Sequence, residues 1–379
     1  MRLLFVSHSF PPAGRLLANI GGMQRVATEL DAALHRHPGA ELETLALRTS
    51  WTWTHVRTPF FLARAYRHIR RHARQEPAPV VLFSSMVTAA LAPLLRRRHP
   101  ALVLAAIVHG RDVTLPAAPY QRLVPRIFAA LDAVLPVSRA TGAQCAARGM
   151  DEEKIHVVPN GIDLARIPPP PDRTAARRAL GAAFPEAVLP EGALLLCSVG
   201  RQVERKGFAW FVDAVLPRLP TDVHYWLAGD GPERGAIEAA AARHGLAERV
   251  RLLGRVSEEA LAALYRGADL FVMPNIPVRG DMEGFGVVML EAGLGGLPVV
   301  AARLEGIRDV ITEGANGHLV ESGDAEAFAA AITRYHGAPQ RLASAAARAR
   351  NHVVQTFGWD AVAQQYVSVL NTIAGASHT

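Results

Sequence analysis

Short apolar runs alternate with helix-like patterns along the chain, and this alternation limits the possible folds more than any other feature. In the first half, buried strands are expected at residues 3–7, 42–47, 80–83, 102–108, 133–137 and 155–158. Helical spacing occurs between them, for example over residues 23–35 and 140–148. Buried strands that alternate with helices are typical of an α/β fold with a parallel sheet.

A run of four prolines at positions 168–171 interrupts the alternation. A short helix is expected at residues 175–180, and strands follow at 194–199, 223–228, 250–253, 270–273 and 299–301. A chain of 379 residues is too long for one ordinary domain. We therefore predict two doubly wound, Rossmann-like domains at 1–165 and 191–358, joined by a linker at 166–190. A C-terminal helix within 359–379 is expected to pack back on the first domain, and a ligand is expected in the cleft between the domains.

Composition and cysteine content indicate a folded protein of a reducing compartment. Half of the residues are hydrophobic and 20% are charged, as in globular proteins. Cys145 and Cys197 are too few for a disulfide framework or a thiolate metal site, so a cytoplasmic location is expected. The first ten residues read as a strand and not as a signal peptide. The uncharged stretch 77–95 contains three prolines, so a strand followed by a helix is favoured over a membrane span.

The positive charge of the chain is concentrated in its first half. Residues 1–165 hold 20 Lys and Arg against 11 Asp and Glu, a net charge of +9, whereas the whole chain carries +7. Five arginines lie in the segment FFLARAYRHIRRHAR, residues 60–74, beside aromatic and aliphatic side chains. This pattern indicates either a basic amphipathic helix on an anionic membrane surface or an ordinary solvated helix face. No nucleic-acid motif accompanies it, so nucleic acid is not an expected partner.

Two glutamates eight positions apart, Glu283 and Glu291, mark the most informative segment, DMEGFGVVMLEAGLGGLPVV. Gly284 and Gly286 leave the backbone beside Glu283 bare, so a ligand can approach closely. A helix is expected from Val287 onward, and its first amides form an anion site. Amides for a phosphate and carboxylates for hydroxyl groups suit a phosphorylated sugar ligand.

An arginine and a lysine lie five positions apart in the loop VGRQVERKG, between an expected strand and an expected helix. The chain uses Arg almost everywhere and has only two lysines, Lys154 and Lys206. Arg201 and Lys206 therefore form a plausible diphosphate clamp, although isolated basic residues are by default solvated surface charges.

Several weaker motifs fall on strand-to-helix loops. Gly21 and Gly22 open a helix, which either allows a close ligand approach or makes a tight turn. His109 ends a buried strand in HGRD, with Asp112 close behind, and is expected to point into the site. Gly229 lies in AGDGP, which is expected to line the nucleotide pocket. Ser138 is expected to cap a helix, and PNGID indicates a turn at residues 160–161.

A metal site is not expected at the acidic pair Asp281 and Glu283. No histidine or third acidic residue accompanies this pair in the sequence. Nucleophile-elbow and zinc-protease motifs are also missing from the sequence. The expected chemistry therefore requires neither a metal nor another cofactor.

Together these residues resemble the retaining glycosyltransferases of family 4, which have the GT-B architecture. The motifs follow the family's order: the Gly21 and Gly22 loop, HGRD, PNGID, VGR…RKG, AGDGP, LGRV and E-x7-E. HGRDV, RKGF and D-x-EGFGVV…LEA are similar to bacterial phosphatidylinositol mannosyltransferases and related α-mannosyltransferases.

The resemblance implies roles for individual residues. Arg201 and Lys206 would bind the donor diphosphate and stabilise the leaving group. Glu291 would hold the ribose, and Glu283 would contact the transferred sugar. The remaining implied contacts are His109 beside the donor sugar, Phe285, Gly284 and Gly286 around it, Gly229 and Gly22 at the donor, and Gly21 and Asp112 at the acceptor.

The implied activity is transfer of a hexose from a GDP- or UDP-linked donor, mannose from GDP-mannose among them, to a lipid-linked or glycan acceptor. Acceptor attack on the front face of the sugar is implied, without a protein nucleophile, and a location at the inner face of the cytoplasmic membrane fits. EGIRD at 305–309 departs from the family's GG-x-P-E, which leaves the donor open. Two alternatives are a nucleotide-sugar epimerase of the same fold and a non-catalytic binding module at a membrane surface.

Overall fold

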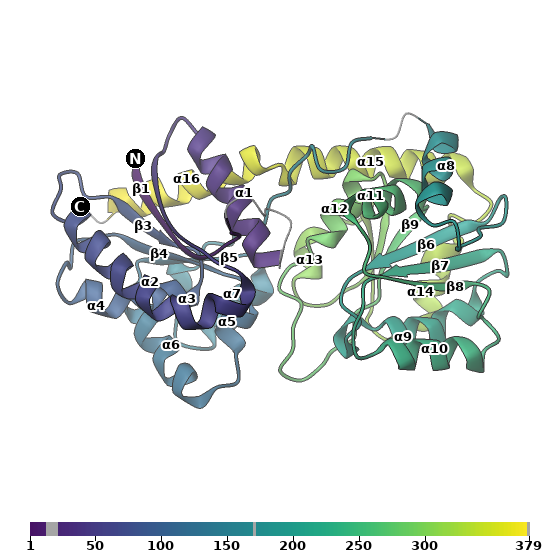
Figure 1. Cartoon of the computed structure of the whole chain (residues 1–379), viewed down its shortest axis with the longest axis horizontal. Coiled ribbons are helices and arrows are strands. Elements are labelled where there is room, and N and C mark those ends of the chain that lie inside the picture. Colours follow the sequence, from purple (N-terminus) through teal and green to yellow (C-terminus); the bar gives the residue numbers. More distant parts are fainter. Residues whose placement is uncertain (13–21, 170–171, 377–379) are drawn as a thin grey trace. The chain divides into compact units, whose positions relative to one another are not determined.

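The computed structural model describes residues 1–12, 22–169 and 172–376, and the chain divides into two compact units (Figure 1). The first unit comprises Met1–Gly161 and Gly358–Thr379, and the second comprises Ile162–Phe357. Each unit is a parallel β-sheet with helices on both faces, which confirms the predicted α/β class.

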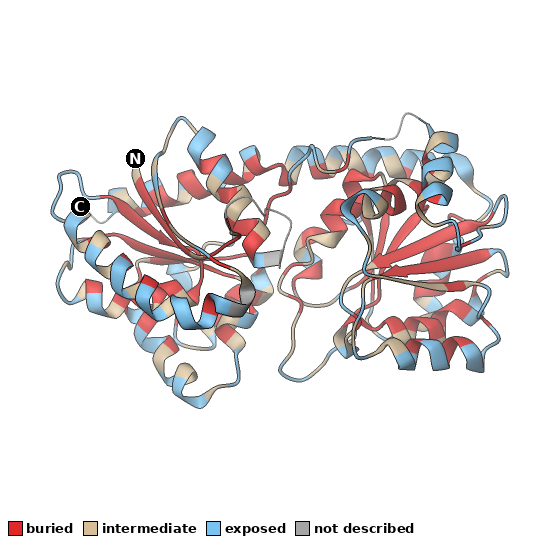
Figure 2. Cartoon of the chain, in the orientation of Figure 1, coloured by how far each residue is buried: buried red, intermediate tan, exposed pale blue. Residues whose placement is uncertain are grey.

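The first unit is built on a five-stranded sheet in the order β2-β1-β3-β4-β5. All neighbouring strands pair in parallel, and Leu3 of β1 lies between Leu42 of β2 and Val80 of β3. The strands are β1 (Arg2–Phe10), β2 (Glu41–Arg48), β3 (Val80–Phe83), β4 (Leu104–Val108) and β5 (Ala133–Pro136). Strands β3, β4 and β5 are buried throughout, as the red strands in Figure 2 show.

Helices of the first unit cover the sheet, and the C-terminal helix α16 packs against α1. They are α1 (Gly22–Arg36), α2 (Trp51–His72), α3 (Met86–Ala89), α4 (Ala92–Arg96), α5 (Arg111–Thr114), α6 (Ala118–Ala130), α7 (Arg139–Ala146), the 3-10 turn Glu152–Lys154 and α16 (Trp359–Ala376). Ser138 caps α7 as predicted, because its Oγ accepts a hydrogen bond from the amide of Thr141 at 3.1 Å.

The second unit has a six-stranded sheet in the order β11-β10-β9-β6-β7-β8. Its strands are β6 (Leu194–Val199), β7 (Val223–Ala228), β8 (Val250–Gly254), β9 (Leu270–Met273), β10 (Val299–Ala302) and β11 (Gly317–Val320). All neighbouring strands pair in parallel, and a core of large side chains, including Phe211, Tyr225 and Phe328, packs on one face of this sheet. Burial of such side chains is the main force that holds the helices to the sheet.

Several helices of the second unit begin at a capping side chain that the sequence supplies. Asp172 caps α8, Ser257 caps α11 and Asp324 caps α14, each by accepting a hydrogen bond from an amide three residues later. The helices are α8 (Arg173–Ala183), α9 (Phe208–Trp210), α10 (Arg234–Arg243), α11 (Glu258–Gly267), α12 (Val288–Leu294), α13 (Ile307–Val310), α14 (Ala325–Thr333) and α15 (Pro339–Phe357). Short turns occur at Glu204–Lys206 and Leu216–Arg218, and a π-helical turn at Phe211–Val215.

Two sequence predictions about local structure are wrong. Residues 155–158 do not form a strand, because only Ile155 makes an isolated bridge, to Val134. Asn160 and Gly161 do not form the expected turn. A Cβ at Gly161 would lie 2.5 Å from the ring of Trp359, so close packing against this tryptophan explains the glycine.

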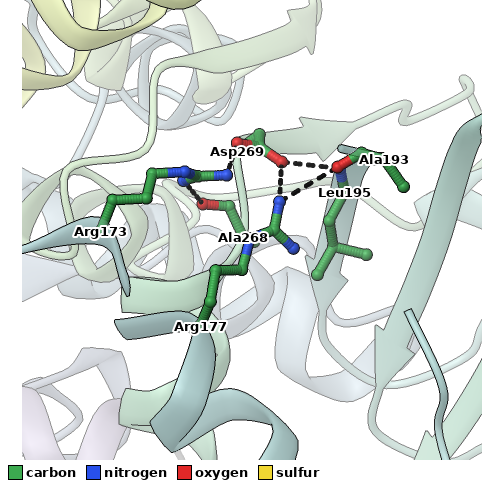
Figure 3. Close-up of polar contacts among 6 residues, drawn as sticks. All are labelled: Arg173, Arg177, Ala193, Leu195, Ala268 and Asp269. Carbon is green, nitrogen blue, oxygen red and sulfur yellow. Dashed lines mark hydrogen bonds and ion pairs between the residues drawn. The ribbon is translucent and has the colours of Figure 1, made fainter. Parts of the chain in front are cut away.

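The segment expected to be a linker contains a packed helix. Helix α8 lies against α11 within the second unit. Two of its arginines reach the end of the sheet: Arg173 and Arg177 both bind the carboxylate of Asp269, which precedes β9 (Figure 3). No helix in the described ranges combines the length and the apolar character that a bilayer crossing requires.

Candidate active site

The loops that carry the main candidate residues meet at one place in the second sheet. Strands β6 and β9 are neighbours, but the chain leaves β6 toward β7 and leaves β9 toward β10, on opposite sides. The loop after β6 holds Arg201 and Lys206, and the loop after β9 holds Glu283. Ligands of open α/β sheets bind where the winding direction reverses in this way, beyond the carboxyl ends of the strands.

Glu283 receives three donors on one carboxylate oxygen. Lys206 Nζ and Arg205 Nη1 each lie 2.5 Å from Oε2, and Asn275 Nδ2 lies 3.4 Å from it. Among the described residues, no donor to Oε1 is found. The second oxygen therefore remains available as an acceptor for a ligand hydroxyl group.

The charges of this cluster fix its protonation. Burial alone would raise the pKa of Glu283, but the Lys206 ammonium and the Arg205 guanidinium outweigh it and lower the pKa to about 2. Burial lowers the pKa of Lys206, and the carboxylate of Glu283 opposes this effect. Glu283 is thus a carboxylate at physiological pH and can only accept hydrogen bonds.

The EGIRD segment, residues 305–309, forms hydrogen bonds with the backbone of Glu283. The carboxylate of Glu305 accepts a hydrogen bond from the amide of Glu283 at 2.5 Å, and the amide of Gly306 donates to the carbonyl of Glu283 at 3.1 Å. Glu305 has φ of 46°, in the left-handed region, and is the sole described non-glycine residue there. The residue therefore adopts the conformation of the glycine that the resemblance leads us to expect at this position.

Glu291 lies on α12 and is almost fully buried. Its Oε1 accepts a hydrogen bond from Arg166, and its Oε2 accepts one from the hydroxyl of Tyr265 at 2.8 Å. Arg166 also binds Glu258, at 2.8 Å. Burial raises the pKa of Glu291, and the Arg166 guanidinium partly opposes this rise.

The other candidates of the second unit lie on these two loops or, for Gly229, just after β7. Arg201 is exposed, and no ion pair or side-chain hydrogen bond ties it to the described residues. Phe285 is buried, and Gly286 has φ of 88°. Gly229 follows β7 with φ of 123°, and a Cβ there would lie 2.0 Å from the carbonyl oxygen of Gly200. Backbone packing therefore already requires glycine at 229, whatever ligand is bound.

A second polar cluster lies at the carboxyl ends of the first sheet. His109 Nε2 is 2.9 Å from the carbonyl of Ser84, and the amide of His109 donates to Asp112 at 2.9 Å. Asp112 also accepts from the amide of Met86 at 3.3 Å, so it ties the end of β4 to the residues after β3. Gly22 is the first residue of α1, whereas Gly21 lies outside the described residues.

His8 joins this cluster without having been predicted from the sequence. Its Nδ1 lies 3.4 Å from Ser85 Oγ. Burial lowers the pKa of His8 to about 4, with smaller contributions from His109 and His55, so the ring is neutral near pH 7. A histidine inside a strand pattern is normally interpreted as a core residue, so no sequence pattern identifies His8 as part of a site.

The sequence analysis also did not predict four residues that contact the two glutamates, namely Arg205, Asn275, Arg166 and Tyr265. Arg205 adjoins Lys206 in the RKG motif, so its place in a motif loop is the signal that could have identified it. Arg166 and Tyr265 lie 125 and 26 positions from Glu291, and their contacts depend on the tertiary fold.

The second unit also has a hollow of about 730 Å³ elsewhere. It is lined by residues of α8, by the loop before β6, and by Trp226 and Asp269, and not by Arg201, Lys206, Glu283 or Glu291. The ion pairs of Figure 3 form part of its wall. This hollow is therefore separate from the residues predicted to bind the donor.

The fold is that of the GT-B glycosyltransferases. Superposition on the crystal structure of HepE of Anabaena, solved in complex with UDP, gives a TM-score of 0.73 over 98% of this chain and 100% of that protein. The two sequences are 19% identical. Structural similarity at such a low sequence identity shows only that the two proteins share a fold.

Sequence comparison then assigns the family. The profile described as Glycosyltransferase Family 4 matches residues 20–166, and the profile described as Glycosyl transferases group 1 matches residues 193–337. The chain therefore belongs to the family 4 glycosyltransferases.

Two curated relatives illustrate this kinship. One, from Mycolicibacterium smegmatis, is a GDP-mannose-dependent alpha-(1-6)-phosphatidylinositol monomannoside mannosyltransferase; it is 29% identical over 94% of this chain and 95% of its own length. The other is a D-inositol 3-phosphate glycosyltransferase of Geodermatophilus obscurus. It is 37% identical over a region that covers 60% of this chain and 50% of the relative's own length.

Proposed function

We propose that this chain transfers mannose from GDP-mannose to a lipid-linked or glycan acceptor, with retention of the anomeric configuration. The observation that carries the proposal is the Lys206, Arg205 and Glu283 cluster at the reversal point of the second sheet. The mannosyltransferase relative that is similar over nearly its whole length supports the choice of donor and a lipid-linked acceptor.

Charge balance in the loop after β6 supports a diphosphate site. Glu283 pairs with Lys206 and Arg205, and Asp281 pairs with Arg205 at 3.2 Å. Arg201 has no such counter-ion among the described residues, so its positive charge is available to an incoming anion. We assign the donor diphosphate to Arg201 and Lys206, whose charges would stabilise the leaving group during transfer.

The two glutamates suit the hydroxyl groups of the donor. Glu283 presents Oε1 as an acceptor, and we assign it to the transferred sugar, beside Gly284, Phe285 and Gly286. We assign Glu291 to the ribose, which would replace or share its present hydrogen bonds with Arg166 and Tyr265. In the first unit, His109 is assigned to the donor sugar and Asp112 to the acceptor side.

The reaction would proceed without a nucleophilic side chain and without a metal ion. The acceptor hydroxyl attacks the anomeric carbon on the face that the diphosphate leaves, and a phosphate oxygen takes its proton. Asp281 and Glu283 are both paired with cationic side chains, which disfavours a divalent ion between them. Transfer should therefore persist in excess chelator.

A lipid-linked acceptor is further supported by the surface of α2. Trp53 and Phe60 are 55% and 77% exposed, and with Val56 they lie at helical spacing on one side of the helix. Exposed aromatic side chains beside a row of arginines suit a membrane interface. We propose that the protein works at an anionic membrane surface through this helix.

The decisive experiment is a thermal-shift panel of GDP-, UDP-, ADP- and dTDP-sugars with the wild type, Arg201→Ala and Glu291→Ala. A ligand at a hundredfold excess over its Kd stabilises the protein by about 2.7 kcal/mol. GDP-mannose should shift the wild type and shift both variants much less.

Product analysis then separates transfer from other uses of the donor. Incubation with GDP-mannose and a phosphatidylinositol acceptor should give an α-mannoside, detectable by proton NMR. A shift with another nucleotide alone would reject GDP-mannose as donor. Epimerised sugar or unchanged donor would reject transfer itself.

A further inference from the structure

Three potential metal ligands converge at the edge of the first sheet. Glu43 lies on edge strand β2, and His68 and His72 lie one turn apart on α2, which packs beside it. One ligand atom from each residue lies within 4.8 Å of the others. Glu43 is the third residue of β2, so the cluster sits toward the amino end of the strand, whereas the His109 cluster sits at carboxyl ends.

Both imidazoles point a nitrogen at the same carboxylate. His68 Nε2 is 2.6 Å from Glu43 Oε1, and His72 Nε2 is 3.2 Å from Glu43 Oε2. In a tetrahedral zinc site with metal–ligand bonds near 2.0–2.1 Å, neighbouring ligand atoms lie about 3.3 Å apart. The observed spacing therefore needs only small side-chain adjustments to hold such an ion.

The second ring nitrogen of His72 shows which atom is free to bind. Nδ1 lies 3.0 Å from the carbonyl oxygen of His68, a contact that is favourable only when Nδ1 carries the proton. In the neutral ring Nε2 then bears a lone pair, and this lone pair faces the carboxylate. Metal-bound histidines typically show this arrangement, with the remote N–H bonded to a carbonyl.

A divalent cation could occupy the space between the two imidazoles and the carboxylate. Protonation of both rings would place two positive charges on rings stacked 4.2 Å apart, on a helix that also carries exposed Arg64 and Arg71. A single divalent ion would satisfy both imidazoles and the carboxylate at once. The exposed arginines extend into solvent, which screens their repulsion of the ion.

We propose that Glu43, His68 and His72 bind a divalent cation of the zinc class, with water at the fourth position. Two imidazoles and one carboxylate are a donor set that zinc prefers over magnesium or calcium. Through these ligands the ion would clamp edge strand β2 to helix α2. This site is independent of the transfer reaction proposed above.

The test is calorimetric titration of the full, chelator-stripped chain with zinc chloride, together with its melting temperature. The wild type should bind about one equivalent and melt at a higher temperature with zinc. H68A/H72A should lose this bound equivalent of zinc. Glu43→Gln should weaken zinc binding at least about tenfold, because substitution even of residues that only support the metal ligands has an effect of this size.

The matched control is His244→Ala, which removes an exposed histidine that pairs with Asp213 at 2.9 Å in the second unit. This variant should bind zinc like the wild type. Absence of binding in the wild type, or equal binding in H68A/H72A, would overturn the proposal and leave a simple ion pair. If H68A/H72A does not fold, Glu43→Gln and the spectrum of bound cobalt, which distinguishes tetrahedral coordination, decide the question.

Discussion

At the residue scale, Glu283 should make the stability of the second unit depend on pH. Its folded-state pKa of about 2 lies below the ordinary 4.5, so its stabilising contribution is complete above pH 4.5 and is lost as the pH falls toward 2. The difference corresponds to about 3 kcal/mol. Glu283→Gln should therefore lower the urea midpoint strongly at pH 7, and the gap from the wild type should narrow below pH 4.

The control for this prediction is Glu248→Gln. Glu248 pairs with Arg251 at 3.2 Å, but its side chain is 92% exposed, so solvent screens the pair. The urea midpoint of this variant should match the wild type at either pH. A gap for Glu283→Gln that stays constant from pH 7 to pH 3.5 would contradict the ion pair described here.

Glu305 combines an unfavourable backbone conformation with a favourable hydrogen bond. Both Glu305→Ala and Glu305→Gly remove the acceptor of the Glu283 amide, but only glycine relieves the left-handed φ of 46°. Glu305→Gly should therefore be more stable than Glu305→Ala by about 1 kcal/mol, measured by chemical denaturation. At Glu321, an exposed loop residue outside the left-handed region, the same two substitutions should not favour glycine.

The sequence was informative where a motif fixes residue type and loop position together. Arg201, Lys206 and Glu283 were placed on the loops after β6 and β9 because polar residues followed buried strands. The pairing of Lys206 with Glu283 could not be predicted, since 77 positions separate them and only the strand order makes β6 and β9 neighbours. Which residues bind the donor stays a prediction.

At the element scale, short apolar runs predicted strands well. The bounds of β3, β6, β7 and β9 agree with the expected ranges. Strand β11 was not predicted because GHLV contains a glycine and a histidine and is only partly buried. Residues 155–158 have an apolar pattern, but that pattern cannot show whether a neighbouring strand offers a full set of hydrogen-bond partners.

Helix α8 should depend on one carboxylate. Asp269 is buried and accepts hydrogen bonds from Arg173, Arg177 and the amide of Leu195 (Figure 3). Asp269→Ala leaves the guanidinium of Arg177 and the amide of Leu195 without their acceptor, which should cost about 1–3 kcal/mol, whereas water can solvate the half-exposed Arg173. Amide hydrogen exchange across Arg173–Ala183 should therefore accelerate markedly.

An exposed aspartate provides the comparison. Asp213 binds Arg243 and His244 at the surface, with its side chain 43% exposed. Asp213→Ala should leave the exchange of α8 unchanged and lower the unfolding midpoint much less. Slow exchange of α8 in Asp269→Ala would show that apolar packing against α11, and not the ion pairs, holds this helix.

At the scale of the whole molecule, the net charge is divided unequally between the two halves of the sequence. Residues 1–165 carry +9, and the remaining residues carry −2. A protein with this distribution experiences an orienting force near an anionic surface, because one half is attracted and the other is weakly repelled. Sequence composition alone established this asymmetry, but the exposure of Trp53 and Phe60 required the structure.

The charged half should therefore bind anionic vesicles in a salt-dependent manner. Each arginine near such a surface contributes about 1 kcal/mol, so Arg64→Gln with Arg67→Gln should weaken binding roughly 30-fold. Trp53→Ser with Phe60→Ser should weaken it without altering the salt dependence, because these side chains act by apolar burial.

The matched control, Arg243→Gln with Arg251→Gln, removes two charges from the second unit and should bind like the wild type. Sedimentation with phosphatidylglycerol vesicles measures all four proteins. Vesicle binding that does not depend on salt concentration would show that charge on α2 does not direct the protein to membranes. An equal loss of binding in the two double arginine variants would show the same.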